Sequence, residues 1–144
     1  MTTTIRTTLA IASVLAFALA SAYLMPRGPV TISQALATML VALAVGVAAT
    51  ALTGRRWAIL LAPLAFMAVF ELGRIGAWGP TVDAPASFGL IHLLAFSMGR
   101  IVHGLLAVVP MLLGGLIGLA LAPRLGVPVA RPLRIGGWIA ASAL

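Results

Sequence analysis

The 144-residue sequence contains no cysteine, no lysine and only two acidic residues. Without cysteine the chain can form no disulfide, thiolate metal site or iron–sulfur cluster, and it has no thiol nucleophile. Charged residues make up 8% of the chain, whereas a soluble domain has about a quarter. Because 62% of the residues are hydrophobic and the mean hydropathy is +1.20, the composition predicts an integral membrane protein.

The positive charge of the chain is not arranged as in a nucleic-acid-binding protein. Nine arginines against two acidic residues give a formal net charge of +7, but they are scattered between apolar runs. The chain also has no nucleophile elbow, P-loop, dinucleotide fingerprint or HExxH sequence. Nucleic acid is therefore excluded as the leading partner, and the sequence contains no catalytic set.

The charged residues divide the chain into apolar intervals that are long enough to cross a bilayer. A hydrocarbon core about 30 Å thick needs about 20 apolar residues in a helix. The sequence therefore predicts an all-α fold, a single transmembrane domain over residues 1–144 with four membrane-spanning helices. These spans are expected at about residues 7–25, 31–53, 57–76 and 101–122.

Two further apolar segments do not fit a complete span. If residues 87–99 joined the fourth span, they would make a helix about 54 Å long, too long for one crossing. We therefore expect a short interfacial or re-entrant helix over 87–99 that bends near Gly99, or else a fourth helix that protrudes from the membrane. Residues 135–144 are uncharged, and about half a span in length, which predicts a truncated fifth helix.

The arginines also predict the orientation of the chain, because arginines in short loops are retained in the cytoplasm. Six of the arginines fall on one side of the predicted membrane, and only Arg27 lies clearly on the opposite side. The N-terminus is expected in the cytoplasm and the protein in the plasma membrane, as a multi-pass protein. Residues 9–22 also resemble a cleavable signal peptide, but the apolar run continues to Met25, which favours a retained helix. The arginines predicted on the cytoplasmic side are Arg6, Arg55, Arg56, Arg124, Arg131 and Arg134.

Four ionisable residues form a predicted polar cluster between the third and fourth spans: Glu71, Arg74, Arg100 and His103. A charged residue inside a membrane segment costs about 2.5–3.5 kcal/mol on insertion scales, so each needs a partner or a function. Glu71 and Arg74 share a helix face, as do Arg100 and His103, and a hairpin would allow a Glu71–Arg100 bridge. Three interpretations are open: a structural cluster, an outward pocket where Glu71 exchanges a proton and an arginine holds an anion, or side chains that snorkel to the membrane interface.

Two secondary candidates lie near this cluster. His92 is eleven residues before His103, on the same face of an unbroken helix, and we expect it at the membrane interface. A metal or haem would need further ligands, or rings that oppose one another from separate helices, so no metal and no cofactor are expected. Asp83 lies in the predicted outside loop, where it would cap the segment that begins at Ser87.

Gly114 and Gly118 form a small-xxx-small face on the fourth span. This face is expected to pack inside the bundle, and it could also contact a second copy of the chain or a membrane partner. The lipid bilayer is the principal partner that the sequence predicts.

Three runs of the sequence resemble a known family. Residues 71–83 (ELGRIGAWGPTVD), followed by 99–106 (GRIVHGLL) and 110–114 (PMLLG), resemble the N-terminal membrane region of actinobacterial α/β-hydrolases related to prolyl aminopeptidases. The resemblance implies helices that anchor a hydrolase domain outside the membrane. The catalytic residues of that family belong to the hydrolase domain, so no residue here inherits them. A small transporter or sensor, or a subunit of a membrane complex, are the alternative functions.

Overall fold

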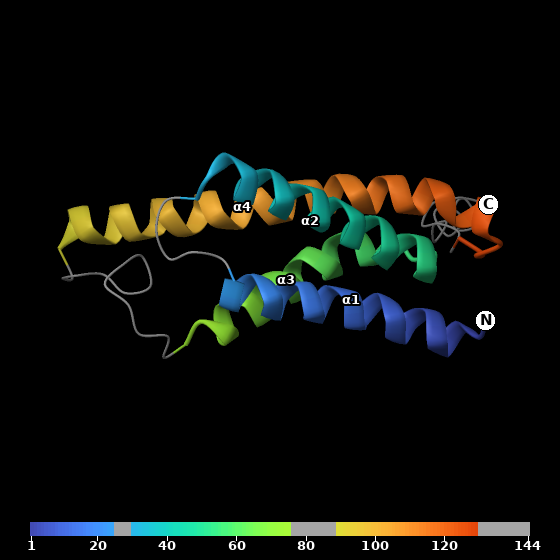
Figure 1. Cartoon of the computed structure of the whole chain (residues 1–144). Helices are drawn as coiled ribbons and strands as arrows, with labels where there is room; N and C mark the ends of the chain where they lie inside the picture. Colours follow the sequence, from blue (N-terminus) through green and yellow to red (C-terminus); the bar gives the residue numbers. More distant parts are fainter. Residues whose placement is uncertain (25–29, 76–88, 130–144) are drawn as a thin grey trace, which may run out of the picture.

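The computed structural model describes residues 1–24, 30–75 and 89–129, without the side chains of Ala95 and His103. These residues form helices α1 (Thr3–Leu24), α2 (Ile32–Thr53), α3 (Ala58–Gly73) and α4 (Leu90–Leu121), followed by the 3₁₀ turn η1 (Ala122–Leu125). No strand occurs in these ranges, as the predicted all-α class requires. Figure 1 shows that the start of α1, the α2–α3 turn and the end of α4 lie at one end of the bundle.

Three of the helices are long and apolar enough to cross a membrane. They are α1 and α2, each of 22 residues, and the 36 residues from Leu90 to Leu125. Helix α3 has 16 residues and ends at Gly73, before the predicted boundary at residue 76. At 1.5 Å per residue it is about 24 Å long, shorter than a hydrocarbon core of about 30 Å. The predicted count of four spans is therefore met by only three helices among the residues described.

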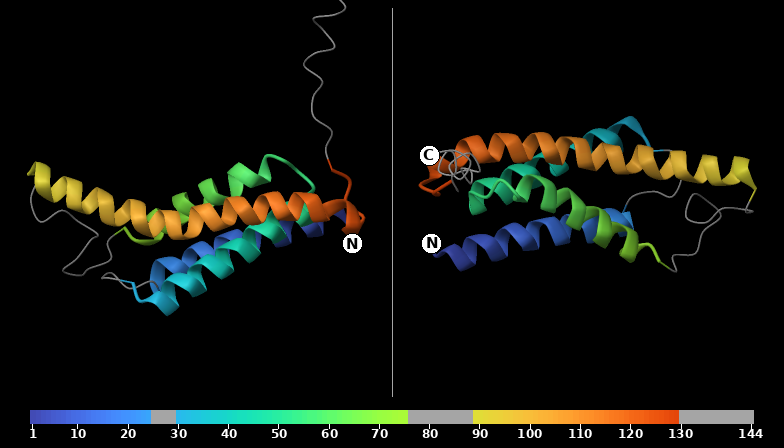
Figure 2. Two further views of the ribbon diagram at one scale, coloured as in Figure 1. Left: turned by 90° about the horizontal axis from the view of Figure 1, so that it is seen from above. Right: turned by 180° about the vertical axis from the view of Figure 1, so that it is seen from behind.

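The prediction of a separate short helix over residues 87–99 is wrong. Helix α4 runs without interruption through Gly99 for 32 residues. A single glycine inside a helix costs about 0.5–1 kcal/mol relative to alanine, which the leucine-rich neighbouring turns can offset. The first turns of α4 extend beyond α1 and α2 (Figure 2), as in the alternative of a protruding fourth helix. The predicted fifth helix, residues 135–144, lies outside the described residues.

The boundaries of α2 have clear chemical causes. Thr31 and Gln34 form a capping box: the Thr31 hydroxyl accepts from the Gln34 backbone N–H, and Gln34 Oε1 accepts from the Thr31 N–H. At the other end Gly54 has φ of 62°, a left-handed conformation in which a side chain would be strained. A Cβ on Gly54 would also lie 2.5 Å from the carbonyl oxygen of Pro128. The turn into α3 therefore depends on glycine.

The core consists of small residues and a few large ones. Phe66 is stacked between Phe17 and Phe70, with ring centroids 5.0 Å and 5.6 Å apart, and this stack joins α1 to α3. Met111 of α4 is buried in the same cluster, among alanines from all four helices. Close packing of this kind needs small side chains where helices cross.

The outer surface is rich in large aliphatic side chains. Leu40 of α2 is 68% exposed, Leu64 of α3 is 64% exposed and Leu116 of α4 is 57% exposed. A soluble bundle would bury such residues and place polar ones outside. The bundle therefore has an apolar exterior on several helices, which is the arrangement expected of helices surrounded by lipid.

Candidate functional site

The centre of the polar cluster is an ion pair between α3 and α4. Arg100 Nη1 donates a hydrogen bond to Glu71 Oε2 at 2.5 Å, which confirms the predicted bridge. The Arg100 side chain is 21% exposed and that of Glu71 is 44% exposed, so the pair lies at the edge of the bundle. Because the two residues are 29 positions apart, the pair connects the end of α3 to the first half of α4.

Both arginines of the cluster also contact aromatic rings of their own chain segment. The Arg100 guanidinium lies 5.2 Å from the centroid of the Phe96 ring, and that of Arg74 lies 5.0 Å from the centroid of Phe70. In each pair the phenylalanine precedes the arginine by four residues, which places both on one helix face. A cation over an aromatic ring is stabilised electrostatically, and this stabilisation is larger where water is excluded. Arg74 is only 7% exposed, so its contact with Phe70 is of the stronger kind.

The end of α3 is held in place by its close contact with α1. A Cβ on Gly73 would lie 3.0 Å from the Cβ of Ala22, so glycine allows α3 to approach α1 here. Immediately afterwards the Arg74 backbone N–H donates to the Glu71 carbonyl, which closes the helix. This local geometry sets the carboxylate of Glu71 toward α4 and buries Arg74 in the bundle.

The structure does not place the other predicted site residues, His92, His103 and Asp83, in this ion pair. His92 is exposed in the first turn of α4, about two turns before Arg100. His103 lies one turn after Arg100 on the same helix, but its side chain is outside what the structure describes, as is the whole of Asp83. Over residues 1–24, 30–75 and 89–129, no group of three histidine, aspartate or glutamate side chains could hold a metal ion.

Gly114 and Gly118 lie in the contact between α4 and α2, the most extensive helix pair of the bundle. A Cβ on Gly114 would overlap the carbonyl oxygen of Leu43, and one on Gly118 would overlap that of Val47. The prediction that these glycines pack inside the bundle is confirmed. Sequence reasoning missed the reciprocal glycine of α2, Gly46, whose Cβ would overlap the carbonyl oxygen of Met111.

Thr50 is a second contributor to this contact that sequence reasoning missed. Its side chain is fully buried, and its hydroxyl lies 2.8 Å from the Gly115 carbonyl oxygen of α4. The same hydroxyl is 3.1 Å from the Gly46 carbonyl oxygen of its own helix. The spacing Gly46-x-x-x-Thr50, one turn apart on α2, is the signal that could have identified this face.

Comparison with models of protein families, with curated proteins and with solved structures finds no match to this chain.

Proposed function

We propose that the chain is an integral membrane helical bundle that serves as an anchor, with no catalytic residues of its own. The observation that carries this proposal is the apolar exterior, where leucines of α2, α3 and α4 are more than half exposed. In water such a surface would favour aggregation, whereas in a bilayer it contacts acyl chains. The lengths of α1, α2 and α4 support the same environment.

In this proposal α3 is a fourth, shorter crossing. Helix α2 ends at one end of the bundle and α4 begins at the other, so the intervening chain has to travel the length of the bundle (Figure 1). A helix of 16 residues can cross if the bilayer thins locally or if flanking residues reach to the interface. Arg55 and Arg56, which are exposed just before α3, are suited to that role.

The proposed orientation places the N-terminus in the cytoplasm of a plasma-membrane protein. Arg6, Arg55, Arg56 and Arg124 belong to the end of the bundle that holds the start of α1 and the end of α4. We call this the arginine end. Glu71 and Arg100 neutralise one another toward the opposite end. Arginines are retained on the cytoplasmic side, which supports this orientation.

The polar cluster is proposed as a structural clamp. Glu71 is the only acidic residue in the described ranges, and its carboxylate is engaged by Arg100. The phenylalanine faces beside Arg74 and Arg100 reduce the cost of placing guanidinium groups in an apolar bundle. The clamp holds α3 against α4. Because α3 has only 16 residues, it has few turns that can pack against its neighbours.

What the bundle anchors is proposed from the sequence resemblance. The first of these runs begins in the last residues of α3, and the runs 99–106 and 110–114 lie in α4; the clamp joins these two helices. A bundle of this kind would hold an α/β-hydrolase domain at the outer face of the membrane. The intact mass of the gene product in its native membrane tests this part. A species much heavier than 14.7 kDa would support it, and a species at 14.7 kDa would contradict it.

The membrane proposal itself is tested by extraction of native membranes. Alkaline carbonate releases peripheral proteins but leaves integral ones in the pellet, so the chain is expected to stay there until detergent is added. Release by carbonate alone would overturn the proposal.

A further inference from the structure

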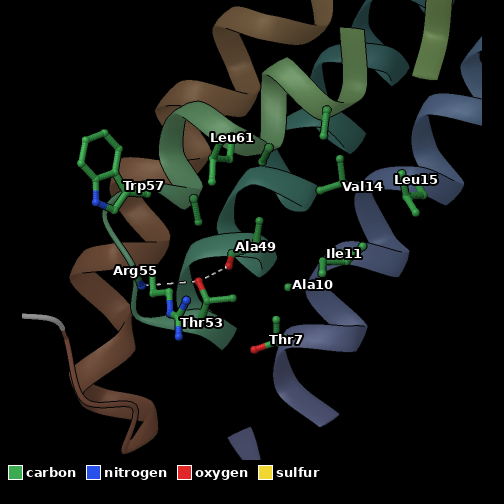
Figure 3. A pocket seen from close by; sticks show the side chains of 13 residues that line it. Thr7, Ala10, Ile11, Val14, Leu15, Ala49, Thr53, Arg55, Trp57 and Leu61 are labelled. Carbon is green, nitrogen blue, oxygen red and sulfur yellow. Dashed lines mark hydrogen bonds between the residues drawn. The ribbon is translucent and has the colours of Figure 1, made fainter. Parts of the chain in front are cut away.

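A pocket of about 380 Å³ opens at the arginine end, between α1, α2 and α3 (Figure 3). Its floor is formed by Ala10 and Val14 of α1, Ala49 of α2 and Ala62 of α3, all of them buried. Its volume is in the lower part of the range of small-molecule sites, about 300–1,000 Å³. The pocket exists because alanines line the three helices where larger residues would have filled the space.

The rim of the pocket lies open toward the apolar exterior of the bundle. Ile11 on α1 is 55% exposed and Leu61 on α3 is 60% exposed, although both also line the pocket. In a bilayer this side faces the acyl chains. A hydrocarbon chain could therefore enter sideways, without leaving the membrane.

One end of the pocket is polar and positively charged. Figure 3 shows Arg55 and Thr53 there, across from Thr7 of α1. The Thr53 hydroxyl is engaged by the backbone: it donates to the Ala49 carbonyl at 2.7 Å and accepts from the Arg55 N–H at 3.4 Å. The exposed side chain of Arg55 supplies the positive charge at this end of the pocket.

The charge at this end has no acidic counterpart in the described ranges. Glu71 is the one acidic residue there, and it is bound to Arg100 away from the arginine end. Trp57, 72% exposed, also lines the pocket beside Arg55. An indole at the membrane interface together with an arginine is typical of a headgroup environment.

We propose that this pocket binds one acyl chain of an anionic phospholipid, whose phosphate is held by Arg55. The apolar floor takes the chain, the sideways opening admits it from the bilayer, and the arginine selects a negative headgroup. The proposal rests on the proposed membrane location and adds a specific lipid ligand to it. The lipid site needs only the residues that line this pocket.

The headgroup contact is tested with a pair of neighbouring variants. The full chain in detergent is titrated with dioleoylphosphatidylglycerol or dioleoylphosphatidylcholine, and bound lipid is measured by native mass spectrometry. We expect tighter binding of the glycerol lipid, and Arg55→Gln should weaken it about fivefold. Arg56→Gln removes the same charge from an exposed residue that does not line the pocket, so its effect should be less than twofold. Equal effects of the two variants, or equal affinity for both lipids, would overturn the proposal.

The acyl-chain contact is tested with a second pair. Ala58→Leu adds a side chain at a half-buried residue that lines the pocket, whereas Ala68→Leu makes the same change on an exposed surface of α3. The first should reduce binding of the glycerol lipid, and the second should not. Glycerol 3-phosphate, which has the anionic group without a chain, should not compete. Competition by glycerol 3-phosphate, or lipid binding unchanged by Ala58→Leu, would show that the acyl chain of the lipid does not occupy the pocket.

These results are separable from the membrane proposal. Carbonate extraction reports whether the chain is embedded, independently of any bound lipid. An embedded chain without lipid preference overturns the pocket assignment alone, whereas a chain released by carbonate overturns the membrane proposal.

Discussion

At the scale of single residues, the ion pair between Glu71 and Arg100 explains how a charged residue is accommodated in an apolar bundle. An arginine in a membrane helix needs a partner, water or a route to the interface. Arg100 has a carboxylate from another helix on one side and the Phe96 ring beside it. The energy of such a pair is modest where the side chains are partly exposed, but loss of one partner leaves the other charge uncompensated.

Glu71→Gln should therefore lower the stability of the bundle without releasing it from the membrane. Since Glu71 is 44% exposed, we expect a loss of about 1–2 kcal/mol, measured by unfolding in detergent micelles. The charge-reversed double variant, Glu71→Arg with Arg100→Glu, is the control and should recover part of the loss. Unchanged stability in Glu71→Gln would contradict the clamp.

Thr50 offers a second test at this scale, because its hydroxyl is the polar contact between α2 and α4. Thr50→Val should cost about 0.6 kcal/mol, and no more than about 1.7, as for other hydrogen bonds between membrane helices. Thr38→Val is the matched control, since the half-buried Thr38 donates its hydroxyl to the Gln34 carbonyl of its own helix. If both variants have equal stability, Thr50 does not join the helices.

At the scale of the helices, the α2–α4 contact depends on glycines that allow the two backbones to touch. Gly114→Ala should destabilise the bundle by more than about 2 kcal/mol, because the added Cβ overlaps the Leu43 carbonyl and the helices must separate. Gly104→Ala in the same helix is the control: its Cβ would meet the flexible end of Met67 at 3.4 Å. Thermal unfolding of the two variants distinguishes them, and similar melting temperatures would contradict a glycine-dependent contact.

The sequence predicts the helices better than it predicts how they end and join. Charges and apolar runs place all four helices, because interval length is a direct measure of span length. The predicted bend at Gly99 is wrong, since an isolated glycine is tolerated in a helix where the neighbouring turns pack well. The capping box at Thr31 was a readable signal for the start of α2 that apolar counting alone overlooks.

Some parts of the candidate sites could be predicted from the sequence, and others could not. The Glu71–Arg100 pair could be predicted because few charges are available and helical spacing limits their directions. The partner of Gly114 could not, since the facing residues of α2 depend on how the two helices cross. The pocket beside Arg55 combines alanines from three helices, which no spacing along one segment reveals.

At the scale of the whole molecule, charge is distributed unevenly along the bundle. Exposed arginines gather at the end that holds the N-terminus, while the acidic residue of the described ranges is neutralised within a helix pair. A bilayer with anionic lipids on its cytoplasmic face favours this polarity in two ways, through retention of arginines and through binding of headgroups. The proposed orientation and the proposed lipid site therefore depend on the same end of the molecule.

Cysteine labelling in intact cells tests the central claim, a bundle that crosses the membrane with its arginine end in the cytoplasm. The chain has no cysteine, so each introduced cysteine reports alone. Arg56→Cys lies at the arginine end and Ser33→Cys in the first turn of α2, at the opposite end; both side chains are exposed. With a membrane-impermeant maleimide, Ser33→Cys should react in intact cells and Arg56→Cys only after permeabilisation. Reaction of both before permeabilisation, or of neither, would contradict the crossing, and the reversed pattern would contradict the orientation.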